Sequence, residues 1–195
     1  MYNSDIKIMV NSTAAEESQN SSNERIDQLK TEPTESVPDE IDNDVYLKDV
    51  IRAFDKLRNV SDFNRVARKV HPISATRDSI LVELTLEEEH VNSKKTMHGG
   101  QTAALVDMIT ARAVGITIKD RAMVSVELAV SYMYPLRLGE TVLIEAKVLK
   151  VGRNMAFTEA ELRRKCDNRI IAKGKHTLAF IPKPATQNGE PFEQF

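Results

Sequence analysis

The feature that most restricts how this chain can fold is the nearly apolar stretch Met97–Ile118, which carries a single acid. It opens with His98-Gly99-Gly100, and alanine, leucine, valine, methionine and isoleucine side chains then surround Asp107. This composition is typical of a helix that is buried on most sides, so the rest of the chain must wrap around it. A carboxylate rarely lies in such a helix without a partner or a chemical task.

Alternation of apolar and polar residues predicts strands on both sides of this helix. The alternating runs are residues 80–87, 124–133, 142–148, 155–165 and 170–181, and Val151-Gly152-Arg153-Asn154 is typical of a hairpin turn. We therefore expect an α+β fold in which an antiparallel sheet of five to six strands curves around the long central helix.

The remaining sequence predicts N-terminal helices and two tails. Apolar residues recur at helical spacing through 45–57, and a second short helix through 63–70 is ended by His71-Pro72. Residues 1–43 are rich in Ser, Asn, Glu, Thr and Pro, which predicts a disordered tail. The expected organisation is thus a tail over 1–43, a folded domain over 44–184 and a flexible C-terminal tail over 185–195.

Charge and cysteine content exclude several classes of protein. Residues 1–44 hold eleven acids and three bases, a net charge of −8, while the rest carries +6. The bases of the folded part are dispersed and lack interleaved aromatic residues, so we expect no nucleic-acid partner. The single Cys166, the absence of an apolar run of membrane length and the lack of a signal peptide predict a cytoplasmic protein without a membrane span, with a mitochondrial location as the alternative.

Several motifs together make the chain resemble the hotdog-fold acyl-CoA thioesterases, of the phenylacetate-pathway and thioesterase superfamily member 2 type. They span about residues 47–180 in the family's order. The motifs are Phe63-Asn64-Arg65, Glu87-Glu88-Glu89-His90, Asn92, His98-Gly99-Gly100, Leu105-Val106-Asp107, Ser125-Val126, Tyr132-Met133, Leu138-Gly139-Glu140, Ala156-Phe157-Thr158 and Gly174-Lys175-His176-Thr177.

The resemblance implies hydrolysis of a fatty acyl-CoA to a free fatty acid and CoA, with no metal and no redox cofactor. It also implies a homodimer whose sheets join edge to edge, often paired into a tetramer. In such a dimer one chain supplies the His-Gly-Gly turn and the other supplies the helix acid.

Five residues match the family's catalytic positions. The Gly99 N–H would stabilise the oxyanion of the thioester carbonyl, and Asp107 would act as general base on water or, alternatively, as nucleophile. Asn92 would orient the water or the carbonyl, and Ser125 would hold Asp107 or its water. His98 would shape the turn and hydrogen-bond near the carbonyl.

Charge alone suggests which residues bind the CoA phosphates. The candidates on the last strands are Lys150, Arg153, Lys173, Lys175 and His176, although a histidine such as His176 is more often a core residue than a ligand. Arg112 departs from the family pattern, since relatives tend to have a small or apolar residue there. It follows Asp107 by five residues, about 140° around a helix, and would weaken that base if it turned toward it.

Two other functions remain open at this point. A non-catalytic acyl-CoA sensor could use the same fold, with the acidic tail as its output. A hotdog hydratase or dehydratase would act on a 3-hydroxyacyl or enoyl thioester and generally relies on a catalytic histidine, so His98→Ala would abolish it. In a thioesterase the more damaging change is expected at Asp107.

Overall fold

The computed structural model describes residues 43–181. The predicted disordered tail, except for its last residue Asn43, and the predicted tail over 185–195 lie outside the described residues. Within them, no helix is both long enough and apolar enough to cross a membrane.

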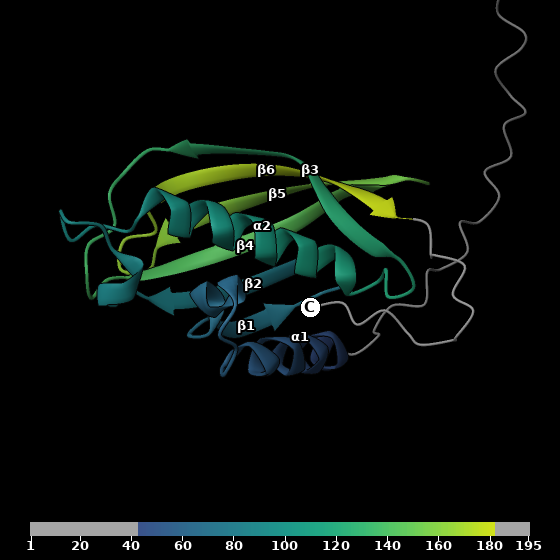
Figure 1. The fold of residues 1–195 in the computed structure, drawn as a ribbon, viewed down its shortest axis with the longest axis horizontal. Coiled ribbons are helices and arrows are strands. Elements are labelled where there is room, and N and C mark those ends of the chain that lie inside the picture. Colours follow the sequence, from purple (N-terminus) through teal and green to yellow (C-terminus); the bar gives the residue numbers. More distant parts are fainter. Residues whose placement is uncertain (1–42, 182–195) are drawn as a thin grey trace, which may run out of the picture. The chain divides into compact units, whose positions relative to one another are not determined.

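The sheet has six antiparallel strands in the order β1-β2-β4-β5-β6-β3 (Figure 1). Five of them match the predicted runs: β2 (Ser79–Thr85), β3 (Ala122–Tyr132), β4 (Thr141–Val151), β5 (Met155–Arg164) and β6 (Ile170–Ile181). The sixth, β1 (His71–Ala75), was not predicted. Proline is tolerated at position 72 because β1 lies at the edge of the sheet and pairs with β2 alone.

The long helix α2 (Gly99–Gly115) lies across one face of the sheet, as the sequence predicts (Figure 1). Leu105, Val106 and Ile109 are fully buried against the strands. A Cβ added at Gly174 of β6 would lie 2.4 Å from Val106 Cγ1, so glycine is needed there for the helix to approach this strand. This close packing sets the height of α2 above β6.

Two shorter segments cover the β1 side of the sheet. The predicted first helix is α1 (Asn43–Leu57), which packs against β1 (Figure 1). The predicted second helix is only the 3₁₀ turn η1 (Phe63–Ala67). Another 3₁₀ turn, η2 (Glu88–His90), interrupts the loop that leads into α2.

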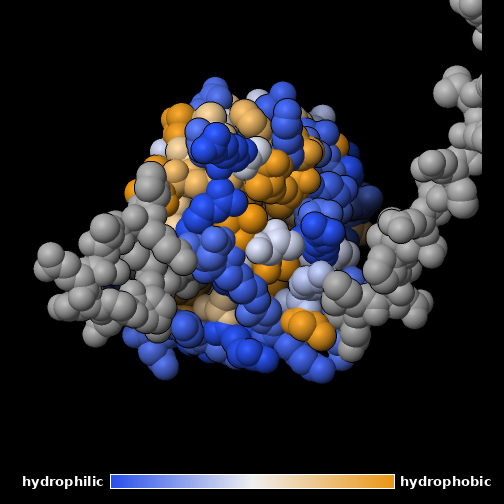
Figure 2. Space-filling model, turned by 90° about the vertical axis from the view of Figure 1, so that its right-hand side faces the viewer, coloured by the Kyte–Doolittle hydropathy of each residue, from blue (hydrophilic) through white to orange (hydrophobic). Residues whose placement is uncertain are grey.

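The edge strand β3 is the exception to the expected burial. Its residues alternate in polarity, yet Val124, Val126 and Leu128 are 45%, 57% and 39% exposed. Among the described strands β3 pairs only with β6, so its outer edge is open. Figure 2 views the molecule from the end where β6 finishes, and apolar residues show in the upper part of this face, with hydrophilic residues between and below them.

Candidate active site

The His98-Gly99-Gly100 turn forms the N-terminus of α2. His98 is the N-cap residue, and its Nδ1 accepts a hydrogen bond from the Gly100 N–H at 2.9 Å. A Cβ on Gly100 would lie 3.0 Å from that Nδ1, so glycine leaves room for the ring. Because Nδ1 is an acceptor, a neutral His98 carries its proton on Nε2.

Gly99 is the first residue of the helix, and its N–H donates to none of the described residues. Free amide groups at a helix N-terminus favour negative charge. The carbonyl of Gly99 instead accepts a hydrogen bond from the Tyr132 hydroxyl at 3.0 Å, which ties the turn to β3. The Gly99 amide is thus fixed in place and available to a ligand oxygen.

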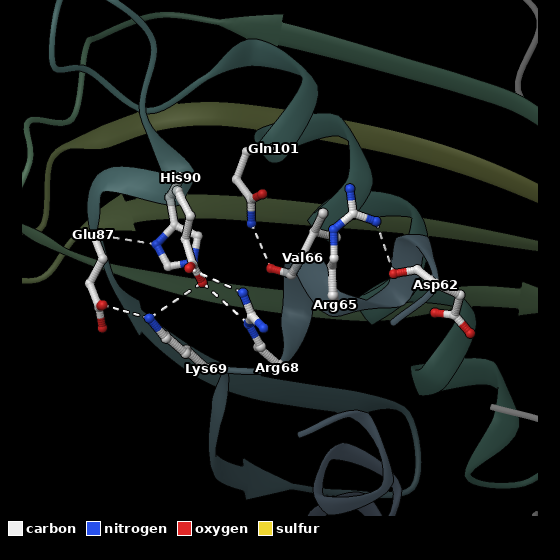
Figure 3. Close-up of polar contacts among 9 residues, drawn as sticks. Asp62, Arg65, Val66, Arg68, Lys69, Glu87, His90 and Gln101 are labelled. Carbon is white, nitrogen blue, oxygen red and sulfur yellow. Dashed lines mark hydrogen bonds and ion pairs between the residues drawn. The ribbon is translucent and has the colours of Figure 1, made fainter. Parts of the chain in front are cut away.

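A polar network behind the turn holds it in position (Figure 3). The buried His90 accepts the Glu87 N–H on its Nδ1 at 2.9 Å (Figure 3). Its carbonyl accepts the His98 N–H, also at 2.9 Å. Gln101, in the first turn of α2, donates to the Val66 carbonyl of η1 at 2.7 Å. Burial lowers the pKa of His90, so this side chain is neutral at pH 7.

Charged residues surround this buried histidine. Glu89 accepts from Arg68 at 3.1 Å and lies 3.3 Å from the Lys69 ammonium. His90 Nε2 lies 3.5 Å from Glu89 but makes no hydrogen bond to the described residues. The network therefore joins η1, η2 and the start of α2, and it leaves the Gly99 N–H without an acceptor among the described residues.

Asn92 is held by its own loop. Its Oδ1 accepts from the Lys94 N–H at 2.9 Å and its Nδ2 donates to Thr96 Oγ1 at 3.0 Å. An amide nitrogen has two hydrogens, so one N–H of Asn92 is left for another acceptor.

Asp107 lies in the middle of α2 and meets two strands. Its Oδ1 accepts a hydrogen bond from Ser125 of β3 at 2.7 Å and lies 3.2 Å from Nε2 of His176 on β6. The Asp107 side chain is 40% exposed, although most of the helix around it is buried. The carboxylate is thus anchored through one oxygen while part of it faces outward.

His176, which the sequence places among the candidates for the CoA phosphates, is buried in the structure. The residue is 1% exposed, and its Nδ1 lies 2.6 Å from the Thr110 hydroxyl, one turn beyond Asp107 on α2. A side chain enclosed in this way cannot reach a phosphate group at the surface. His176 belongs instead to the surroundings of Asp107.

The charge state of His176 follows from its burial. Burial lowers its pKa and the Asp107 carboxylate opposes that shift, so the imidazole is neutral at pH 7. The Thr110 hydroxyl has one hydrogen and lies within reach of two acceptors, His176 Nδ1 at 2.6 Å and the Val106 carbonyl at 2.7 Å. Donation to Nδ1 would leave the His176 Nε2–H toward the Asp107 carboxylate. The 3.2 Å contact between His176 Nε2 and Asp107 does not have the geometry of a hydrogen bond, and a neutral imidazole does not neutralise the carboxylate.

Arg112 does not reach Asp107. Its Nη2 donates to Asp49 of α1 at 2.8 Å, on another face of α2. Arg112 therefore does not weaken Asp107 as a base, since the two side chains make no contact.

One chain does not bring the two halves of the site together. Gly99 and Asp107 are eight residues apart on one helix, about 12 Å along its axis. One thioester group cannot contact both the Gly99 amide and the Asp107 carboxylate over that distance. Two copies of α2 running antiparallel could place the amide of one beside the carboxylate of the other.

The four other CoA candidates lie in two places. Lys150 and Arg153 are exposed at the β4–β5 hairpin. Lys173 and Lys175 are exposed on the face of the sheet away from α2, where Lys173 pairs with Glu161 at 2.7 Å. Across residues 43–181, no group of three histidine, cysteine or acidic side chains could hold a metal ion.

Known sequences support the family resemblance that the motifs indicate. The sequence profile of the thioesterase superfamily matches residues 94–171. A protein of Caenorhabditis elegans named as an esterase is 52% identical over 149 residues, which cover 75% of this chain and 88% of that protein. Human acyl-coenzyme A thioesterase 13 is 43% identical over 131 residues, covering 67% and 91% of the two chains.

Solved structures agree with the sequence relatives. The crystal structure of zebrafish thioesterase superfamily member 2 is 38% identical and matches with a TM-score of 0.67, covering 69% of this chain and 98% of that one. The sheet wrapped around a central helix is therefore the hotdog fold that the motifs predict.

Proposed function

The chain belongs to the thioesterase superfamily, and we propose that it hydrolyses fatty acyl-CoA to a free fatty acid and CoA at a centre shared by two chains. The observation that carries the proposal is the state of the two predicted groups. The Gly99 amide has no acceptor among the described residues. Asp107 is held by a hydrogen bond from Ser125, and 40% of its side chain is exposed.

The Gly99 amide is suited to stabilise the oxyanion. When water attacks the thioester carbonyl, negative charge develops on its oxygen, and an amide fixed at a helix N-terminus stabilises that charge without reorganisation. The bond from Tyr132 to the Gly99 carbonyl and the cap from His98 fix the amide's direction. The remaining N–H of Asn92 would orient the carbonyl or the water.

Asp107 is suited to act as the general base. It would take a proton from water while the water oxygen bonds to the carbonyl carbon, and collapse of the intermediate would break the carbon–sulfur bond. CoA would leave as a thiolate and recover the proton from Asp107, so no further acid is needed. Direct attack by the Asp107 carboxylate on the carbonyl is the alternative first step.

A dimer would complete the centre. The open edge of β3 and its exposed apolar residues Val124, Val126 and Leu128 suit pairing with a second copy. Edge-to-edge pairing of identical strands is antiparallel under twofold symmetry and sets the two copies of α2 antiparallel as well. A pair of such dimers would make the expected tetramer.

Lys150 and Arg153, exposed and at one hairpin, are the better candidates for the CoA phosphates.

The test compares Asp107→Asn with the wild-type protein across a panel of acyl-CoAs, using a thiol-reactive dye to follow free CoA. The variant should lose at least about a hundredfold in turnover, the range for a lost general base. Asp78→Asn, in the exposed β1–β2 turn, is the matched control and should keep full activity.

Other results would contradict the proposal. Near-normal turnover by a folded Asp107→Asn protein would remove Asp107 as the base. Wild-type protein that binds acyl-CoA without releasing CoA would be a sensor. Interconversion of an enoyl-CoA and a 3-hydroxyacyl-CoA that depends on His98 but not on Asp107, with no release of CoA, would indicate a hydratase or dehydratase.

A further inference from the structure

A groove lies between α1 and the C-terminal end of α2, outside the cluster around Asp107. Its volume is about 290 Å³. Asp49, Arg52 and Lys56 of α1, spaced three and four residues apart on one helix face, line one side. Arg112 of α2 and Lys119, which follows the helix, line the other.

The groove carries a positive excess. Four cations face one acid, Asp49, which leaves three positive charges uncompensated within the groove. Asp49 is already shared, since it lies 2.8 Å from Arg112 and 3.3 Å from Lys119. Arg52 and Lys56 form no ion pair within residues 43–181. The carbonyl end of α2 subtracts only about half a charge.

Arg112 is the buried member of this set. Its side chain is 12% exposed, and its Nε is enclosed without a hydrogen-bond partner in the described part of the chain. Burial lowers the pKa of Arg112, and Asp49 only partly offsets this effect. A buried guanidinium with an unused donor indicates that Asp49 does not fully compensate it.

A second charged groove shows that such an excess is not a general feature of this surface. The groove on the outer face of the sheet is lined by Glu145, Glu159 and Glu161 and by Lys147, Lys173 and Lys175, so its charges cancel. Lys173 pairs with Glu161 at 2.7 Å and Lys147 with Glu145 at 2.9 Å. That groove neutralises itself, whereas the α1–α2 groove does not.

From the volume, the charge excess and the incompletely compensated Arg112, we propose that the α1–α2 groove binds a compact polyanion of the diphosphate type. The volume lies at the lower end of ligand pockets, which suits a diphosphate group better than a whole nucleotide. The site lies on a different face of α2 from Asp107, because Arg112 points to Asp49 while Asp107 meets Ser125 and His176. The groove is therefore distinct in position from the Asp107 cluster of the same chain.

The experiment titrates the full-length protein with inorganic pyrophosphate in a calorimeter. Saturable binding with one site per chain, weakening as salt is raised, is expected. Arg52→Gln combined with Lys56→Gln removes the two unpaired cations and leaves the pair between Arg112 and Asp49, so the fold should be kept. Its affinity should fall at least about tenfold.

A matched variant controls for net charge. Arg77→Gln combined with Lys94→Gln also removes two exposed cations, both outside the groove, and should bind pyrophosphate as the wild type does. The proposal is overturned if the wild type shows no saturable binding, or if the groove and control variants lose affinity equally.

A competition arm identifies the source of the diphosphate, since CoA carries one too. If a separate phosphorylated ligand is the natural occupant, pyrophosphate will not displace CoA, and the groove variant will keep the wild-type rate of CoA release. If pyrophosphate and CoA compete and the groove variant loses affinity for both by the same factor, the groove holds the diphosphate of CoA.

Discussion

Replacing Gly99 with proline isolates the contribution of a single backbone N–H. Gly99 is the first residue of α2, the position where proline is best tolerated in a helix. His98 before it has φ −66° and ψ 134°, a conformation that a following proline favours. Because the Gly99 N–H has no acceptor within the described chain, its removal breaks no internal hydrogen bond.

The expected effect falls on the chemical step. Loss of one oxyanion donor costs about 10²–10³ in rate in acyl-transfer enzymes, or roughly 2.7–4 kcal/mol of transition-state stabilisation. The Cβ that proline adds would lie 3.6 Å from the Tyr132 ring, which is an ordinary contact distance. The free energy of unfolding should stay equal or rise slightly, since proline restricts the unfolded chain.

The assay measures free CoA release at saturating acyl-CoA, together with thermal unfolding. Gly99→Ala is the matched control, because it adds the same Cβ but keeps the N–H, and it should retain most of the turnover. A proline variant that unfolds normally and keeps wild-type turnover would refute the oxyanion role of this amide. Equal losses in both variants would attribute the effect to the Cβ instead.

Two further predictions concern stability. Gly174→Ala should lower the free energy of unfolding by about 1–3 kcal/mol, because the new Cβ would lie 2.4 Å from Val106, and chemical denaturation will measure this. Burial lowers the pKa values of His90 and His176 in the folded state, whereas in the unfolded chain both histidines have the ordinary pKa of about 6.5. Below that pH the unfolded chain therefore binds more protons than the folded one. Stability should therefore be complete above that pH and fall as the pH drops below it, and His90→Gln should reduce the slope. An unchanged slope in a folded His90→Gln protein would contradict this explanation.

The sequence was most informative where one periodicity extended over a long run. The apolar stretch that became α2 and the five alternating strands appear close to their predicted bounds. The strand β1 was missed because it is short and contains Pro72, which only an edge position accommodates. Alternation in β3 correctly indicated a strand but could not show that its apolar residues stay exposed within residues 43–181.

Charge was the least reliable guide to the site. The sequence predicts phosphate binding by Lys173 and Lys175, but pairing of β4, β5 and β6 brings glutamates beside them. His176 was a candidate phosphate ligand because of its possible positive charge, and the sequence could not show that this side chain is buried. The partner of Arg112 is Asp49, which is 63 residues earlier in the chain, so no local spacing could have identified it.

The most direct test of the shared centre is complementation between two inactive variants. Asp107→Asn and Gly99→Pro proteins are purified separately, unfolded and refolded together in equal amounts, and free CoA release is measured. If each centre takes its amide from one chain and its carboxylate from the other, mixed dimers regain one intact centre, and about a quarter of wild-type activity should return. Activity in the refolded mixture no higher than that of either variant alone would contradict a centre built from two chains.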